Sequence, residues 1–90
     1  MSTKSKVTIY QQKPRYRYVP VQEILENEDG KYVTYSISVR TIEEEVAYVK
    51  DVTTKLDKIQ ELTDQFTKDQ LDPKYLDMLI DSFIRDELLL

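Results

Sequence analysis

The sequence predicts a small α+β domain in which an antiparallel sheet of three strands packs on a C-terminal two-helix hairpin. Three observations lead to this prediction. Residues 32–40 alternate between apolar and polar side chains, as in a strand with one buried face. Gly30, the only glycine, directly follows Asp29 before this run, and an Asp-Gly pair at this place indicates a hairpin turn. From residue 53 onwards, the apolar residues recur at helical spacing.

The strand on the N-terminal side of the turn lies in the segment "RYRYVPVQEIL". Pro20 has no N–H to donate, so we expect an edge position or a bulge near it. A third strand is expected at residues 46–52, after the acidic turn "IEEE". Residues 7–10 would add a fourth strand, so the sheet spans about 7–52 of one domain that covers residues 1–90.

The alternating strand predicts which side chains face water. The apolar set, Val33, Tyr35, Ile37 and Val39, is expected on the buried face. The polar set is expected on the exposed face and consists of Tyr32, Thr34, Ser36, Ser38 and Arg40.

The first helix is expected at residues 54–68. Its apolar stripe is Leu56, Ile59, Leu62 and Phe66. Thr54 is the expected N-cap, with Asp57 three residues later as in a capping box.

The second helix is expected at residues 73–87. Asp72 is its predicted N-cap, because it precedes Pro73, which is favoured at the first helical position. Leu71 and Leu76 have the spacing of a hydrophobic staple. The apolar stripe of this helix is Leu76, Leu79, Ile80, Phe83 and Ile84.

Asp77 and Asp81 lie one turn apart beside this stripe. A metal site or an acid–base pair would require carboxylates that converge in a cleft. Two residues on one helix flank do not converge by themselves, so we expect ion pairs of Asp77 with Lys74 and of Asp81 with Arg85.

The chain ends in "DELLL". Glu87 falls on the apolar stripe, so we expect the helix to fray or turn there. The leucines at 88–90 would then fold back on the core or meet a second subunit, which makes a homodimer one alternative.

The composition excludes several functions. The 90 residues include no cysteine and no histidine, which removes disulfides, thiol nucleophiles, Ser-His triads and almost every zinc site. We therefore predict no catalytic residue, no metal site and no cofactor. No apolar run is long enough to cross a bilayer and the N-terminus does not resemble a signal peptide, so we expect a cytoplasmic protein without a membrane partner.

A basic and aromatic segment, "RYRY" at residues 15–18, is the first candidate binding site. Interleaved arginines and tyrosines can bind single-stranded nucleic acid, but the net charge of −4 argues against nucleic acid as a partner. The alternatives are a strand with its tyrosines inward and its arginines outward, or a protein-binding surface. The candidate partner-binding residues are Arg15, Tyr16, Arg17, Tyr18, Tyr32, Asp77 and Asp81.

The acidic residues suggest a second function. Six of them lie at the expected hairpin ends: Glu26, Glu28, Asp29, Glu43, Glu44 and Glu45.

Our first hypothesis is a non-enzymatic protein-interaction module, a small cytoplasmic regulator or adaptor with an unidentified protein partner. The alternative is an acidic phage-type inhibitor that mimics nucleic acid or blocks a nucleic-acid enzyme such as a CRISPR effector.

The order "YRYVPV", "YSISV", "DVTTKLDKIQEL" and "LDPKYLDMLIDSFI" resembles a family of small uncharacterised proteins from spore-forming Gram-positive bacteria. That family is catalogued only as a domain of unknown function. It has a Tyr-Arg-Tyr strand, a Tyr-Gly-Ile strand, an Asp-Ile-Ser helix start and a Ser-Pro-x-His-Leu-x-Asp final helix. The matching positions are Tyr16, Arg17, Tyr18, Tyr35, Ile37, Asp51, Pro73, Leu76, Asp77 and Asp81.

This chain departs from the family pattern at several positions. Ser36 replaces the glycine, Val52 and Thr53 replace Ile-Ser, Asp72 replaces the serine and Tyr75 replaces the histidine. The last change argues against histidine chemistry. The resemblance implies the fold and a bacterial cytoplasmic setting, but no activity.

Overall fold

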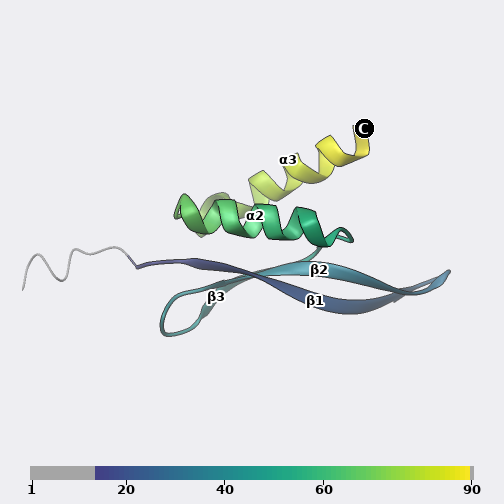
Figure 1. Cartoon of the computed structure of the whole chain (residues 1–90), viewed down its shortest axis with the longest axis horizontal. Coiled ribbons are helices and arrows are strands. Elements are labelled where there is room, and N and C mark those ends of the chain that lie inside the picture. Colours follow the sequence, from purple (N-terminus) through teal and green to yellow (C-terminus); the bar gives the residue numbers. More distant parts are fainter. Residues whose placement is uncertain (1–13, 90) are drawn as a thin grey trace, which may run out of the picture.

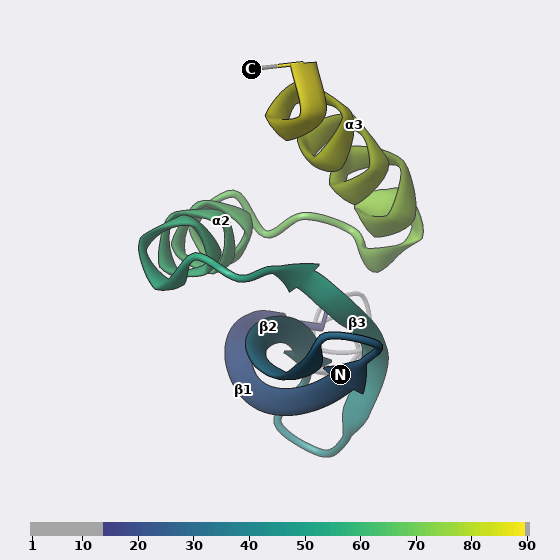
Figure 2. The same ribbon diagram turned by 90° about the vertical axis from the view of Figure 1, so that its right-hand side faces the viewer.

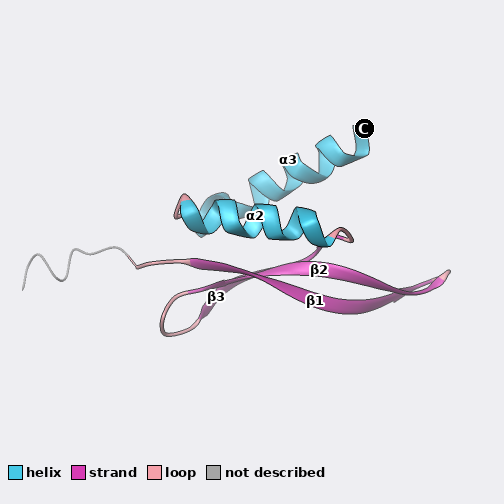
Figure 3. Ribbon diagram, in the orientation of Figure 1, coloured by secondary structure: helices cyan, strands magenta, loops and turns pink. Residues whose placement is uncertain are grey.

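The computed structural model describes residues 14–89 and contains an antiparallel sheet followed by two helices (Figures 1 and 3), which confirms the predicted α+β fold. The elements are β1 (Arg17–Asn27), β2 (Gly30–Arg40), β3 (Glu45–Thr53), α2 (Leu56–Lys68), a short 3₁₀ helix η1 (Pro73–Tyr75) and α3 (Leu76–Leu89). The fourth strand expected at residues 7–10 lies outside the described residues.

The sheet has the order β1-β2-β3, so β2 is its middle strand. β1 and β2 form a hairpin whose register runs without a shift from Arg17 opposite Arg40 to Asn27 opposite Gly30. Gly30 has a φ of 119°, which confirms the predicted turn, because only glycine adopts this conformation without strain. Pro20 lies on an edge strand, as its missing N–H predicts.

The irregular pairing of the sheet lies between β2 and β3 and not at Pro20. The register shifts once between Tyr35 and Ile37 and once between Val39 and Arg40. Asp51 of β3 has a φ of 56°, a left-handed conformation that aspartate tolerates better than most residues. A bulge in β3 therefore accompanies the first shift.

The two helices lie on the same side of the sheet but diverge from each other. Figures 1 and 2 show α2 running along the sheet and α3 leaning away from it towards the C-terminus. α2 packs mainly on β1, whereas α3 contacts β3 near its own start. Within residues 14–89, no other element thus lies against one side of α3 along most of its length.

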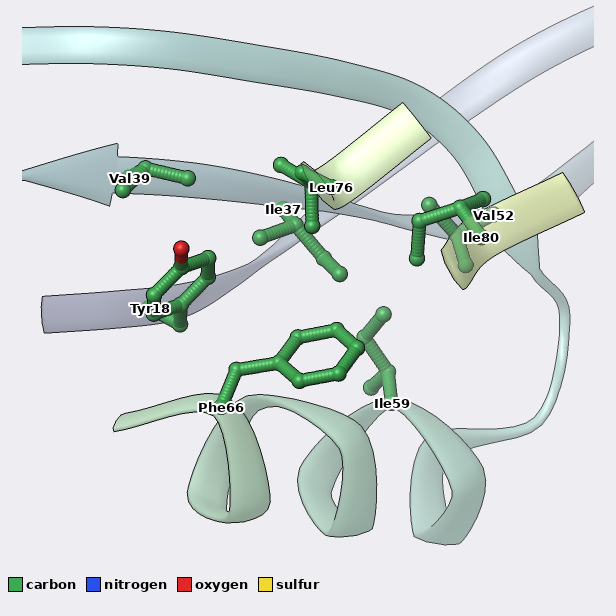
Figure 4. Close-up of a cluster of buried hydrophobic side chains, with 8 residues drawn as sticks. All are labelled: Tyr18, Ile37, Val39, Val52, Ile59, Phe66, Leu76 and Ile80. Carbon is green, nitrogen blue, oxygen red and sulfur yellow. The ribbon is translucent and has the colours of Figure 1, made fainter. Parts of the chain in front are cut away.

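The hydrophobic core lies between the sheet and the helices (Figure 4). Ile37 of β2 and Ile59 of α2 are completely buried at its centre. Tyr18 meets the ring of Phe66 edge-on, with 5.5 Å between the ring centroids. The buried core side chains are Tyr18, Ile37, Val39, Val52, Ile59, Phe66, Leu76 and Ile80.

The start of α2 corrects the predicted cap. The N-cap residue is Lys55, which makes no side-chain capping bond, and Thr54 is not the cap. The hydroxyl of Thr53 accepts a hydrogen bond from the N–H of Lys55 at 3.2 Å. This local turn leads the chain out of β3 and delays the helix.

The start of the last helical segment confirms the predicted cap. The Asp72 side chain accepts a hydrogen bond from the N–H of Lys74 at 3.1 Å, and Pro73 occupies the first position. The first turn is a 3₁₀ helix, and α-helical geometry begins at Leu76. Leu71 and Leu76, the expected staple, both pack in the core.

The predicted fraying at Glu87 is wrong, because α3 continues to Leu89. The Glu87 carboxylate pairs with the ammonium group of Lys55 at 3.2 Å. Glu87 therefore occupies the next position of the buried stripe of α3, and its carboxylate lies against the start of α2. None of the helices between residues 14 and 89 is long and apolar enough to cross a membrane.

The burial of Ile37 gives a stability prediction. Ile37→Val should lower the free energy of unfolding by about 0.5–1.5 kcal/mol, because it removes a buried methyl group. The matched control is Ile24→Val on the exposed end of the hairpin, where the side chain is 64% exposed. The control should change stability by less than about 0.5 kcal/mol in urea titrations. Equal losses for both variants would contradict the assigned core.

Candidate functional site

The polar face of β2 is buried where the sequence predicts exposure. Thr34, Ser36 and Ser38 are almost completely covered, so this part of the prediction is wrong. These small side chains lie on the middle strand, opposite larger ones such as Glu23 of β1 and Tyr48 of β3. The flanking strands therefore shield them from water.

The buried hydroxyls form a hydrogen-bonded network with carboxylates. Ser36 donates to Glu23, and Ser38 donates to Glu45 at 2.9 Å. Thr34 donates to Asp51 at 2.6 Å, and the Tyr32 hydroxyl donates to the other oxygen of Asp51 at 3.1 Å. We call these seven residues the hydroxyl network.

The hydrogen bonds of the hydroxyl network shift the pKa values of two of its members. The hydrogen bond from Ser36 lowers the pKa of Glu23, which makes its carboxylate a weaker base for activating a hydroxyl. Burial raises the pKa of Tyr32, and the hydrogen bond to Asp51 adds to this effect. Every buried side-chain polar atom within residues 14–89 has a hydrogen-bond partner. The network therefore secures β3 against β2.

The described part of the chain holds no group of three His, Cys, Asp or Glu side chains placed to bind a metal ion. Asp77 and Asp81, which the sequence raised as a metal or acid–base pair, are exposed on α3.

A surface groove lies at the end of the sheet opposite the β1–β2 turn. It has a volume of about 790 Å³. The start of β1 and the β2–β3 turn, which contribute its lining, lie at the same end of the sheet (Figure 1). We call it the arginine groove. Its lining residues are Pro14, Arg15, Arg17, Arg40, Thr41, Ile42 and Glu43.

The strand register brings the arginines together. Arg17 and Arg40 are direct cross-strand partners, so their side chains leave the sheet on the same face. Arg15 lies two residues before Arg17, at the same edge. Glu45 pairs with Arg40 at 3.6 Å, so one of the three positive charges is partly balanced within the chain.

The β2–β3 turn presents an isoleucine beside these charges. The Thr41 N–H donates to the Glu44 carbonyl at 2.9 Å, and the Thr41 hydroxyl accepts from the N–H groups of Glu43 and Glu44 at 3.3 Å. The turn is thereby closed on itself. Ile42, at its tip, is 98% exposed.

The structure separates the predicted "RYRY" residues into two groups. Arg15 and Arg17 are exposed and line the arginine groove. Tyr18 belongs to the core, so its assignment as a surface residue is wrong, and Tyr16 is half-buried against the core. This is the alternative in which the tyrosines point inward and the arginines outward.

The remaining predicted residues lie elsewhere. Tyr32 belongs to the hydroxyl network. Among the described residues, neither Asp77 nor Asp81 forms an ion pair within 4.0 Å, so the expected pairs with Lys74 and Arg85 are absent. Lys74 instead lies over the ring of Tyr75, 5.1 Å from its centroid.

Sequence reasoning missed Arg40 and Ile42. The signal was present as an apolar residue next to three consecutive acids in "RTIEEE", where a solvated turn has no need of isoleucine. Only the structure shows that this turn meets Arg15 and Arg17: the strand register pairs Arg17 with Arg40, and the groove lining adds Arg15.

The comparisons with known proteins add no further constraint: no family model matches the chain, and neither the curated proteins nor the solved structures include a significant match. The resemblance to the spore-former family stays a prediction.

The buried Tyr18 gives a pH-dependent prediction. Burial, with a smaller effect of Asp72, raises the pKa of Tyr18 to about 12. Above the ordinary tyrosine pKa of about 10, the unfolded chain loses this proton first. The contribution of Tyr18 to stability should therefore be constant below about pH 10 and fall between about pH 10 and 12. Tyr18→Phe should show a shallower fall in urea titrations across this range, and an unchanged slope would contradict the burial of the hydroxyl.

The left-handed backbone conformation of Asp51 gives a stability prediction. Asp51→Ala and Asp51→Gly both remove the carboxylate that Thr34 and Tyr32 bind. Only alanine keeps a Cβ at the φ of 56°. The alanine variant should therefore be less stable than the glycine variant by about 1 kcal/mol, measured as the free energy of unfolding. Equal stabilities would show that β3 does not hold Asp51 in the left-handed region.

Proposed function

We propose that this chain is a non-enzymatic protein-interaction module, and that its arginine groove binds an acidic segment of a partner protein that carries an apolar residue. The observation that supports the proposal most directly is the placement of Arg15, Arg17 and Arg40 around one groove beside the fully exposed Ile42.

The groove lining contains three arginines and one carboxylate, that of Glu43, so its net charge is positive and favours an anionic ligand. Like charges directly opposite each other across two strands are destabilising, and Arg17 and Arg40 are such a pair. A carboxylate between them would relieve the repulsion. Guanidinium groups also bind carboxylates through two parallel hydrogen bonds, which suits the side chains of Asp and Glu.

Ile42 favours a protein as the source of these carboxylates. An apolar side chain that is 98% exposed gains free energy when a partner covers it. The closed turn at Thr41 holds Ile42 in place before binding, so little conformational entropy is lost. An apolar residue among the acids of the partner would pack on Ile42.

Mimicry of nucleic acid has less support. The acids Glu28 and Asp29 lie at the β1–β2 turn, while Glu43 and Glu44 lie at the β2–β3 turn. The 11 residues of β2 separate these two turns, which corresponds to roughly 35 Å. The hairpin acids therefore form two separate groups, and neither continues the other as a run of phosphates would.

The proposal predicts the outcome of a peptide selection. A random peptide library displayed on phage and selected on the immobilised protein should yield peptides with several Asp or Glu residues around one aliphatic or aromatic residue. Arg15→Gln combined with Arg17→Gln should weaken binding of a selected peptide at least about tenfold, which corresponds to the loss of two charge-assisted contacts. Fluorescence anisotropy measures the affinity.

A second groove variant separates the effect on binding from an effect on folding, and a charge-matched control separates it from an effect of net charge. Ile42→Ser should also weaken binding, while its free energy of unfolding changes by less than about 0.5 kcal/mol. Lys31→Gln combined with Lys50→Gln makes the same charge change at exposed positions outside the groove, and should leave binding unchanged. The proposal is wrong if basic peptides are selected, or if the groove and control variants lose affinity equally. Tighter binding of a mixed-sequence single-stranded oligonucleotide than of any selected peptide would also contradict it.

A further inference from the structure

Helix α3 has a second ordered face that does not contact the core. Its core face consists of Leu76, Ile80, Phe83 and Glu87, which are buried or half-buried. The opposite side carries Met78, Asp81, Arg85 and Leu88, which we call the outer face. The spacing of these four residues is three, four and three, the spacing that places side chains along one seam of a helix pair.

The outer face is exposed along its whole length. Met78 is 61% and Leu88 is 82% exposed. Asp81 and Arg85 are exposed, and within residues 14–89 neither forms an ion pair within 4.0 Å. Figures 1 and 2 show that α3 leans away from the sheet, so no other element of the described chain covers this side.

The arrangement of the outer face is self-complementary. Met78 and Leu88 lie at equal distances before and after position 83, and so do Asp81 and Arg85. A second α3 that runs in the opposite direction, related by a two-fold axis at position 83, places each Met78 against the partner's Leu88. The same operation places each Asp81 against the partner's Arg85.

We propose that two copies of this chain associate through the outer faces of α3, packed antiparallel about a two-fold axis near residue 83. The contact consists of two central ion-pair layers, with an apolar layer at each end. Ile84, 36% exposed beside the seam, lies next to its own copy across the axis. A parallel arrangement would place Asp81 against Asp81 and Arg85 against Arg85, so the charges select the antiparallel one.

The size of the contact indicates a reversible dimer. α3 has 14 residues, about 21 Å of helix, and the outer face supplies two apolar and two charged positions from each copy. Such an interface is at the small end of specific protein contacts. We therefore expect a dimer that forms and dissociates with concentration.

The dimer is independent of the arginine groove. The groove is built from β1, β2 and the β2–β3 turn, and none of its lining residues lies on α3. A dimer would carry two grooves and could bind a partner with two acidic segments more tightly than one groove binds a single segment.

Charge reversal tests the proposal. Sedimentation velocity over a range of concentrations should show the wild-type chain shifting from monomer to dimer. Arg85→Asp alone gives four facing carboxylates, and Asp81→Arg alone gives four facing guanidinium groups. Each should raise the dissociation constant at least about tenfold. The double variant Asp81→Arg/Arg85→Asp exchanges the two charges and should restore the dimer.

The controls distinguish this contact from general effects of charge and folding. Asp86→Arg makes the same charge change as Asp81→Arg at an exposed position outside the seam, and should leave the dimer intact. Circular dichroism should be the same for all variants. A wild-type chain that remains monomeric at the highest concentration overturns the proposal. So does a dimer that resists both single reversals, or a double variant that fails to restore association.

Discussion

The contact between the first strand and the end of α2 determines how the rest of this molecule is arranged. β1 is an edge strand of the described sheet, and no strand within residues 14–89 pairs with the outward N–H groups of β1 or of the segment that leads into it. The N–H of Tyr18 donates to the Thr67 hydroxyl at 2.9 Å, and the N–H of Tyr16 donates to the Gln70 side chain at 2.9 Å. The next outward position is Pro20, which has no N–H. Two side chains of the helix end and one proline therefore complete an edge that would otherwise bind another strand.

The contact between β1 and the end of α2, which we call the β1–α2 seam, also explains the unusual backbone conformation after α2. Gln70 has a φ of 50°, a position that usually requires glycine. Its side chain accepts from the Tyr16 N–H and donates to the Tyr16 carbonyl, both at 2.9 Å, which compensates for the strain. The Leu71 N–H closes the turn on the Phe66 carbonyl at 3.1 Å, and the Leu71 carbonyl accepts from the Tyr18 hydroxyl at 2.6 Å. The loop that leads to α3 is thus fixed by β1.

Both proposed surfaces depend on this contact. Because Tyr18 of β1 and the preceding Tyr16 face the core, Arg15 and Arg17 are directed outward into the arginine groove. Because the loop after α2 is held by Tyr18, α3 starts on β3 and then leaves the sheet, which exposes its outer face. The hydroxyl network secures the other edge strand, β3, against β2.

The sequence predicted the elements that rest on local chemistry, and it failed where a contact joins distant segments. The turn at Gly30 and the cap at Asp72 depend on a few neighbouring residues, and these predictions agree with the structure. The predicted helix stripes are correct for Ile59, Leu62, Phe66, Leu76, Ile80 and Phe83, and wrong for Leu56, Leu79 and Ile84, which are exposed. The burial of Ser36 and Ser38 depends on side chains of two other strands, so alternation alone wrongly predicted an exposed face. The arginine groove was half predicted, because Arg15 and Arg17 were candidates, whereas Arg40 and Ile42 join them only through the strand register.

The strength of the β1–α2 seam can be measured directly by amide hydrogen exchange. Tyr18 and Gln22 both lie at outward positions of the same edge strand, and the N–H of Tyr18 is bound by Thr67. The amide of Tyr18 should exchange only when the domain unfolds, whereas the amide of Gln22 should exchange far faster. In Thr67→Val, the amide of Tyr18 should lose this protection. If the Tyr18 amide of the unmodified protein exchanges as fast as that of Gln22, the seam does not hold β1, and the arrangement of both proposed surfaces loses its basis.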